Sequence, residues 1–235
     1  MGFQKWLRKV VIGGGKGGPK DLAMQWTKAL WCAKLWQTPR WLGMEIWQWP
    51  TDLLIMQELI YELKPKVILE TGTAHGGSAI FYSSMLRLLG GGRVISVDIE
   101  KNDAVHKKVL EHPFGSDVTL ITGDSKAPEI LDQVREALAG ETEILVVLDS
   151  DHSYAHVLGE LRVYKDFVPL NGYLVVFDTI CKALGDVPGL ADWREDNPLR
   201  SVEEFLAETP EFELDKSREK LLVSFAPSGF LRRIR

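Results

Sequence analysis

The strongest constraint on the fold is the alternation, from about residue 65 onwards, of short apolar segments with longer amphipathic ones. Continuous apolar segments are typical of strands buried on both faces, and the spacing between them is typical of helices. The expected strands are 67–70, 93–98, 118–124, 143–149 and 173–178, and the expected helices between them are 78–89, 103–111, 127–139 and 155–167. This order predicts an α/β fold with a doubly wound, mostly parallel sheet.

The region before this alternation predicts an addition to the sheet. Six tryptophans lie in residues 26–49, and residues 52–63 have the pattern of an amphipathic helix that ends before Pro65. We therefore expect a tryptophan-rich helical N-terminal cap over 21–64, followed by a main domain over 65–235. The aromatic side chains of the cap also predict a possible interface for a homo-oligomer.

The region after the alternation predicts a different edge to the sheet. An irregular stretch over 181–198 is followed by an expected helix over 201–208. The segments "FEL" (212–214) and "LLVSF" (221–225) flank the charged turn "DKSREK". We expect these two segments to form an antiparallel C-terminal hairpin at the sheet edge.

The first twenty residues have a composition of their own. Residues 1–20 carry five basic residues and no acidic one, although the whole chain has a net charge of −5. The acidic remainder argues against a nucleic-acid-binding face. Residues 1–12 alternate apolar and basic side chains at helical spacing, which is typical of a packing helix or of a helix on a membrane surface. With the linker "GGGKGG", residues 1–20 are expected to be a basic tail of a cytoplasmic protein, peripheral at the membrane in the second case.

Each expected strand ends on or just before a carboxylate. These acids are Glu70, Asp98, Asp124, Asp149 and Asp178. In doubly wound sheets, ligands bind in the crevice outside the carboxyl ends of the strands. A crevice lined by carboxylates suits a ligand with hydroxyls and cationic groups, or a metal ion, and it does not suit a bare phosphate.

The turn "ETGTAHGGS" (70–78) follows the first strand and narrows the choice of ligand. It lacks the Gly-Lys-Ser/Thr of a P-loop, and it has Ala74 where a dinucleotide-binding turn has its second glycine. Glu70 would repel a pyrophosphate, but it would attract an amino group. S-adenosylmethionine fits this pattern, because it combines a sulfonium, an α-amino group, a carboxylate and an adenosine.

A role for each residue of the cofactor site follows from its position. Glu70 is expected to face the amino group, the glycines would let backbone amides approach the carboxylate, and Asp98 would bind the ribose hydroxyls. Asp124 and Ser125 would face the adenine, and Ser78 would bind the methionine end or cap its helix. The expected cofactor-binding residues are Glu70, Gly72, Thr73, Gly76, Ser78, Asp98, Asp124, Ser125 and Asp149.

The motifs of the chain also resemble those of a known family. They are "WLGMEIWQWPTDLLIMQELIYELKPKVILETGTAHGGSAIFYSSML", "SVDIE", "GDS", "DSDHSYAHVLGELRVYKDFVPLNGYLVVFDT" and "APSGFLRR". Over about residues 40–235 the chain resembles the cephalosporin hydroxylase / rhamnosyl O-methyltransferase family. The resemblance implies the Rossmann-like fold of class I S-adenosylmethionine-dependent methyltransferases. It also implies methylation of a hydroxyl on a sugar or a glycosylated small molecule, with Mg²⁺ as an assisting ion.

The resemblance assigns catalytic roles to three residues. Asp149 is similar to the first metal ligand, Asp178 to the last, and His152 to the general base, with Asp149 also in the catalytic set. A divalent ion would lower the pKa of the acceptor hydroxyl, and a histidine would then take its proton. The family usually has Glu-Asp at the end of the fifth strand, where this chain has Phe177-Asp178.

This departure leaves one metal ligand to be found. Thr179 is the expected replacement oxygen, with Asp151 as an alternative. Metal dependence is therefore an open expectation, because a phenylalanine cannot bind Mg²⁺.

Two other classes of function also stay open. A degenerate, non-catalytic S-adenosylmethionine-binding protein is one. An iron oxygenase is disfavoured, because no His-x-Asp or His-x-Glu of a facial triad occurs.

Several other residues allow both a structural and a functional interpretation. His75 lies in the cofactor turn and would contact ligand or face solvent. Trp41 and Trp47 would pack in the cap or stack on the acceptor. Cys181 is expected to be a packing residue rather than a nucleophile, and His156 to be structural.

Overall fold

A seven-stranded sheet forms the centre of the computed structural model, which describes residues 18–235. The expectations for residues 1–17, including membrane contact, lie outside the described residues. The strand order is β5-β4-β3-β6-β7-β9-β8. The strands are β3 (Val67–Thr71), β4 (Arg93–Asp98), β5 (Val118–Thr122), β6 (Ile144–Leu148), β7 (Tyr173–Val176), β8 (Phe212–Leu214) and β9 (Phe230–Arg233). Strands β3 to β7 pair in parallel, so the predicted α/β fold is confirmed.

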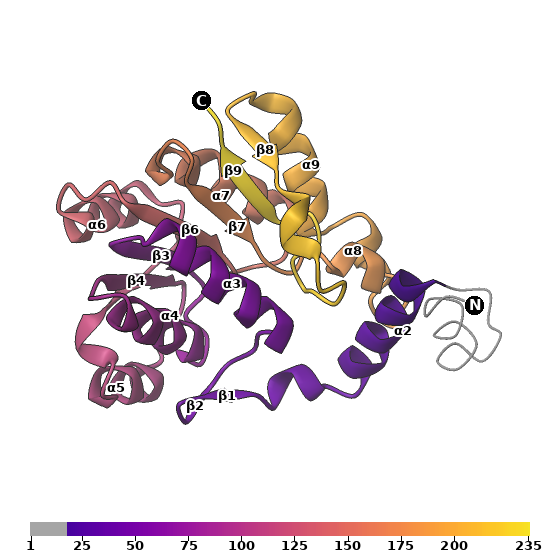
Figure 1. Cartoon of the computed structure of the whole chain (residues 1–235), viewed down its shortest axis with the longest axis horizontal. Helices are drawn as coiled ribbons and strands as arrows, with labels where there is room; N and C mark the ends of the chain where they lie inside the picture. The colour runs from indigo at the N-terminus through magenta and orange to yellow at the C-terminus, as the bar shows by residue number, and fades with distance from the viewer. Residues whose placement is uncertain (1–17) are drawn as a thin grey trace, which may run out of the picture.

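Helices cover both faces of this sheet (Figure 1). One face is covered by α3 (Pro50–Leu63), α4 (Gly77–Leu88) and α5 (Asp103–Glu111), and the other by α6 (Pro128–Leu138), α7 (Tyr154–Tyr164) and α9 (Pro198–Glu208). The strands alternate their apolar side chains between two hydrophobic clusters, one on each face. The two clusters bury β3 and β6 completely, which explains why these strands lack a polar face.

The tryptophan-rich segment packs at one end of the molecule. It contains α2 (Pro19–Cys32), a short 3₁₀ turn (Leu35–Gln37), and a two-stranded ladder of β1 (Arg40–Trp41) and β2 (Met44–Glu45). Leu30 of α2 lies in a third hydrophobic cluster with Leu184 and Phe225. Leu184 belongs to α8 (Cys181–Leu184), so the stretch expected to be irregular contains a helical turn that holds α2 in place.

The predicted C-terminal hairpin is correct in kind but wrong in its second strand. β8 pairs antiparallel with β9, and β9 lies between β8 and β7. Residues 221–225 form no strand and pass instead over the start of α3. There, Thr51 donates a hydrogen bond to the carbonyl of Val223, and the Phe225 amide donates to Asp52 Oδ2 at 2.7 Å. Phe230 and Leu231 of β9 are almost fully buried, so this strand takes the central position.

Two helix boundaries differ from the expected ones by three residues. α9 begins at Pro198 rather than 201, because Asn197 Oδ1 accepts a hydrogen bond from the Arg200 amide and caps the helix. α7 ends at Tyr164, and 3₁₀ geometry continues the predicted helix over Lys165–Phe167. Among residues 18–235, no helix has the length and apolar character needed to span a bilayer.

Candidate active site

The site lies where the order of the sheet changes direction. β3 and β6 are neighbours, but the chain continues from β3 towards β4 and from β6 towards β7, on opposite sides. The two loops that leave these strands, 72–76 and 149–153, therefore separate and open a crevice at the carboxyl edge of the sheet. The five strand-end acids predicted from the sequence lie along this edge, in or just after their strands.

Glycines in the turn after β3 allow the backbone to pass very close to its neighbours. Gly72 has a φ of +91°, and a Cβ there would lie 1.9 Å from the carbonyl oxygen of Asp149. A Cβ on Gly77 would lie 2.1 Å from the carbonyl oxygen of Glu45. The turn is therefore held between the residue that follows β6 and the end of β2, and only glycine fits these two positions. Gly76 has a φ of +78° and contacts Val109 of α5, so its role is to start α4.

A cavity of about 410 Å³ extends from this turn past β4 to β5. Its lining includes Gly72, Asp98, Asp124, Ser125, Asp149 and His156. Asp98 Oδ2 accepts a hydrogen bond from the Ala74 amide at 3.0 Å, so the carboxylate joins the turn to β4. Its Oδ1 accepts from the Glu100 amide at 3.0 Å, and Asp98 lines the cavity at the end of the second strand, where a ribose would need acceptors.

Ser125 is held in place by a buried acid. Glu160 is fully buried on α7 and accepts hydrogen bonds from Ser125 Oγ at 2.6 Å and from Ser150 Oγ at 2.9 Å. His156 Nε2 lies 3.2 Å from the same carboxylate, and this contact raises the pKa of His156. The Ser125 hydroxyl therefore donates its hydrogen bond within the protein, to Glu160. Asp124 is the exposed acid at this end of the cavity. His156 is structural, but it also lines the cavity.

Glu70 lies beneath the turn and is only 1% exposed. Neither of its carboxylate oxygens has a hydrogen-bond partner among the described residues. Burial raises the pKa of Glu70 to about 7. Glu70 lines neither cavity, and a proton neutralises its buried carboxyl, because a buried free charge is costly.

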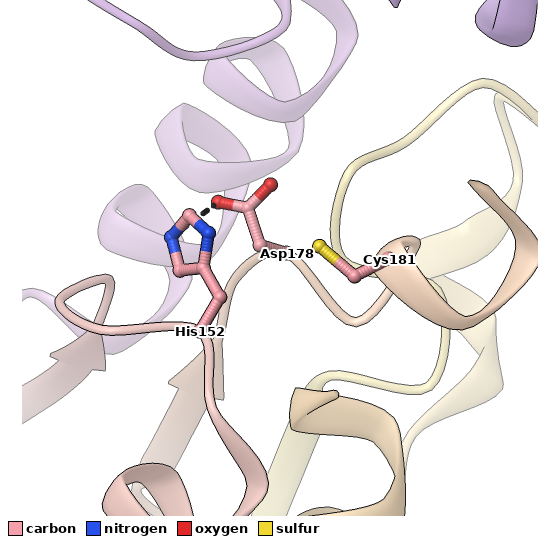
Figure 2. Close-up of side chains that lie close together, drawn as sticks. All are labelled: His152, Asp178 and Cys181. Atoms are coloured by element: carbon pink, nitrogen blue, oxygen red, sulfur yellow. Dashed lines mark ion pairs between the residues drawn. The ribbon is translucent and has the colours of Figure 1, made fainter. Parts of the chain in front are cut away.

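A second cavity of about 230 Å³ adjoins the first, and both are lined by Gly72, Ala74, Asp149 and Ser150. Asp149, His152 and Asp178 line its floor, and Thr73 and Ser78 line its side towards α4. His152 Nε2 lies 3.2 Å from Asp178 Oδ2 and 4.0 Å from Asp149 Oδ1. Figure 2 shows the imidazole facing the Asp178 carboxylate from the loop after β6. The predicted base and the two predicted acids are therefore brought together.

The surroundings of Asp149 disfavour its charged form. Burial, and then the neighbouring Asp178 carboxylate, raise the pKa of Asp149 well above its usual range. Asp178 has a φ of +54°, a left-handed conformation that costs free energy and is retained mainly where function needs it. In the described chain, neither cavity has a lysine or arginine in its lining. This donor set of carboxylate oxygens fits a divalent cation such as Mg²⁺.

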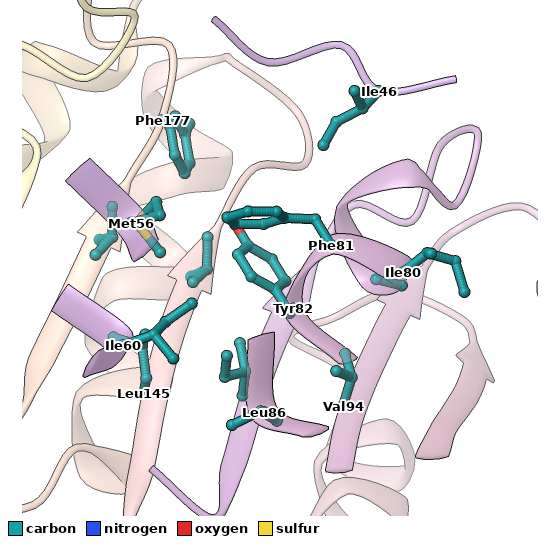
Figure 3. Packing of buried hydrophobic residues seen from close by; sticks show 14 of the residues in the cluster. Ile46, Met56, Ile60, Ile80, Phe81, Tyr82, Leu86, Val94, Leu145 and Phe177 are labelled. Carbon is teal, nitrogen blue, oxygen red and sulfur yellow. The ribbon is translucent and has the colours of Figure 1, made fainter. Parts of the chain in front are cut away.

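Three residues near the acid pair supply no further oxygen ligand for a metal ion. Phe177 points into the hydrophobic cluster beside Met56, as Figure 3 shows. Thr179 is buried and donates its hydroxyl hydrogen to the carbonyl of Pro227 at 2.6 Å, so the structure does not bring this expected ligand to the cavity. Asp151 accepts from the Ser153 amide and lines only the first cavity, so it does not supply the alternative ligand.

Cys181 lies on the far side of Asp178 from His152 (Figure 2). Burial raises the pKa of this thiol, so it remains a protonated packing residue as predicted.

Aromatic side chains form the opposite wall of the second cavity. Trp31, Trp36, Trp47 and Phe225 line it, and Trp31 stacks on Trp36 with ring centroids 4.8 Å apart. Trp36 Nε1 is buried and has no hydrogen-bond partner among the described residues. His75 packs against Trp47 at 4.4 Å and lines the same cavity. Trp41 instead packs on Phe81 and donates to Ser84 Oγ, away from the cavity.

Sequence reasoning missed three buried polar residues: Gln48 lines the second cavity, and Asp52 and Glu160 hydrogen-bond to residues that line the cavities. Gln48 and Asp52 are 3% and 1% exposed, and each has one side-chain oxygen without a partner in the described chain. Burial raises the pKa of Asp52 to about 7. A polar residue on the core-facing side of a predicted helix, such as Asp52, is the only sequence signal that could have revealed them.

The strand order, the antiparallel β9 and the acidic crevice define a class I methyltransferase, an enzyme that takes its methyl group from S-adenosylmethionine. The comparisons agree with this class. The model of the Rhamnosyl O-methyltransferase/CmcI family matches residues 33–234, so the chain belongs to that family. Its members include S-adenosylmethionine-dependent O-methyltransferases, and the resemblance predicted from the sequence is confirmed.

Individual relatives show how far the similarity extends. The rhamnosyl O-methyltransferase of Mycobacterium leprae is 32% identical over 204 residues, which are 85% of this chain and 85% of the relative. The solved structure of CmcI with Mg and SAM has a TM-score of 0.61 at 17% identity and covers 85% of this chain and 78% of CmcI. An O-methyltransferase from Bacillus cereus in complex with SAH has a TM-score of 0.56 at 15% identity, and the match covers 98% of this chain and 96% of that protein.

Proposed function

We propose that this protein transfers the methyl group of S-adenosylmethionine to a hydroxyl of a sugar or a glycosylated small molecule. The observation that carries the proposal is the position of His152, which lies beside the carboxylates of Asp178 and Asp149 and lines an aromatic cavity beside the cofactor turn. The rhamnosyl O-methyltransferase relatives support a sugar as the acceptor. The division of the chain into a cap over 21–64 and a catalytic domain over 65–235 forms part of the same proposal.

S-adenosylmethionine supplies an electrophilic methyl group, so the protein must supply an acceptor oxygen without its proton. His152 accepts that proton at the ring nitrogen that does not face the acids, while Nε2 faces Asp178 and Asp149, whose carboxylates stabilise the imidazolium that results. Gly72 and Asp149 line both cavities, so a cofactor in the first cavity and an acceptor in the second would meet beside these two residues. Close, aligned positioning at this junction supplies the rest of the rate enhancement.

Asp149 and Asp178 are the residues that would hold Mg²⁺, which would supply a positive charge that lowers the pKa of the acceptor hydroxyl. The same two carboxylates also serve the reaction directly. They orient His152 and favour cations over anions in the cavity, because neither has a lysine or arginine opposite it in the described lining.

The acceptor binds against the aromatic wall. Indole rings stack on the apolar face of a sugar ring, and the unpartnered Trp36 N–H would donate to a sugar hydroxyl.

Replacing Trp47 with alanine should raise KM for the acceptor about tenfold, a loss typical of one aromatic contact. The affinity for S-adenosylmethionine should stay unchanged. The matched control is Trp26→Ala, because Trp26 is 57% exposed on α2 and lines neither cavity.

The experiment that tests the function is a turnover assay with S-adenosylmethionine and a panel of rhamnosides and other hexosides. Formation of S-adenosylhomocysteine together with a methylated glycoside supports the proposal. Binding of S-adenosylmethionine without turnover on any member of the panel would favour the non-catalytic alternative. A gain in mass by oxygen rather than by a methyl group would favour an oxygenase.

A further inference from the structure

The acid pair lacks a third oxygen ligand at the position where Phe177 stands. Phe177 is 3% exposed and packs on the α3 and α4 side of the sheet, in one cluster with Tyr82. Gln48 reaches the site from that same side, because it lies between β2 and α3 and its Nε2 is 3.4 Å from the Tyr82 hydroxyl. The side chain of Gln48 therefore approaches the acid pair from the side of the sheet on which the apolar Phe177 packs.

The Gln48 amide is oriented by Asp149. Its Nε2 donates to Asp149 Oδ2 at 3.2 Å, so the carbonyl Oε1 must be the other terminal atom. Gln48 is 3% exposed and lines the second cavity, and Oε1 has no hydrogen-bond partner among the described residues. Leaving a buried carbonyl without a hydrogen-bond partner is unfavourable, so a group of this kind indicates a ligand that is bound there.

We propose that Gln48 is a ligand of the divalent cation held by Asp149 and Asp178, through its Oε1. This inference rests on the proposed function and specifies its metal site. Amide carbonyl oxygens are ordinary ligands of Mg²⁺ and Ca²⁺. The substitution of a neutral amide for a carboxylate leaves one negative charge fewer at the site, so the cation binds more weakly than at a site with three carboxylates.

The test measures cation binding directly, with Mn²⁺ as the probe and electron paramagnetic resonance of free Mn²⁺ as the readout. The full chain is used, saturated with S-adenosylhomocysteine. Gln48→Leu should weaken Mn²⁺ binding about tenfold or more, and Gln48→Glu should tighten it about tenfold. Gln133→Leu is the matched control, because it removes the same amide from an exposed position on α6 and should change nothing.

Three results would overturn the inference. They are Mn²⁺ binding by Gln48→Leu as tight as that of the unsubstituted protein, no tightening in Gln48→Glu, and no Mn²⁺ binding by the unsubstituted protein. A loss of S-adenosylhomocysteine affinity in a folded Gln48→Leu protein would overturn it too, since Gln48 would then serve the cofactor. Methyl transfer that persists in a chelator, without Mn²⁺ binding, would leave the proposed function standing and remove only the role of Gln48.

Discussion

At the scale of single residues, the site depends on a histidine placed between carboxylates. The 3.2 Å contact between His152 Nε2 and Asp178 fixes the ring so that it faces the acceptor cavity. A neutral side chain of similar size would keep a hydrogen bond to Asp178 but could not accept a proton. A substitution that keeps the hydrogen bond and removes the basic nitrogen therefore tests the role of His152 as a base without disturbing the fold.

We predict that His152→Gln lowers kcat by about 10²–10⁴-fold, the usual contribution of a general base, and leaves cofactor affinity unchanged. Steady-state kinetics and calorimetric titration with S-adenosylmethionine measure the two quantities. The matched control, His106→Gln on α5, should retain full activity, because His106 lines neither cavity. Full turnover by His152→Gln would show that another group takes the proton.

At the scale of the elements, the glycine turn holds two strands together. Gly72 and Gly90 both have positive φ, +91° and +102°, but only Gly72 has a neighbour that a Cβ would meet. Gly90→Ala should therefore cost about 1 kcal/mol, the conformational penalty alone. Gly72→Ala adds the overlap with the Asp149 carbonyl and should cost about 3 kcal/mol or more, because β3 and β6 must separate.

Chemical denaturation of both variants measures this difference. Gly72→Ala should also lose S-adenosylmethionine affinity, since the turn lines both cavities, whereas Gly90→Ala should bind normally. Equal losses of stability in the two variants would contradict the role of close packing at Gly72.

The sequence predicts elements well where a local pattern determines them. The parallel strands followed from apolar runs, and the acids at their ends came together because strand order alone places them on one edge. Residues 221–225 have an equally apolar pattern but form no strand, because β9 occupies the place beside β7. Thr179 and Gln48 show the same limit in the site, since their hydrogen-bond partners, Pro227 and Asp149, are distant in sequence.

At the scale of the whole molecule, the site stores unfavourable electrostatic free energy until a cation binds. Glu70 has a pKa raised from 4.5 to about 7, so between these values the folded protein binds a proton that the unfolded chain releases. The stability of the ligand-free protein therefore falls as pH rises through this window. The loss of stability amounts to about 3 kcal/mol, and it is absent below pH 4.5 and complete above pH 7.

We predict that Glu70→Gln removes this part of the pH dependence. Below pH 4.5 the two proteins should have similar stability, and above pH 7 the variant should be more stable by up to about 3 kcal/mol. Denaturant unfolding across this range measures the difference, with Glu213→Gln on the exposed side of β8 as the control. The role expected for Glu70 from the sequence, contact with the cofactor's amino group, would add a loss of S-adenosylmethionine affinity above pH 7 in this variant. Parallel stability curves for the two proteins at all pH values would mean that Glu70 already has a compensating partner, and the cationic ligand would then have to be held by the Asp149 and Asp178 pair alone.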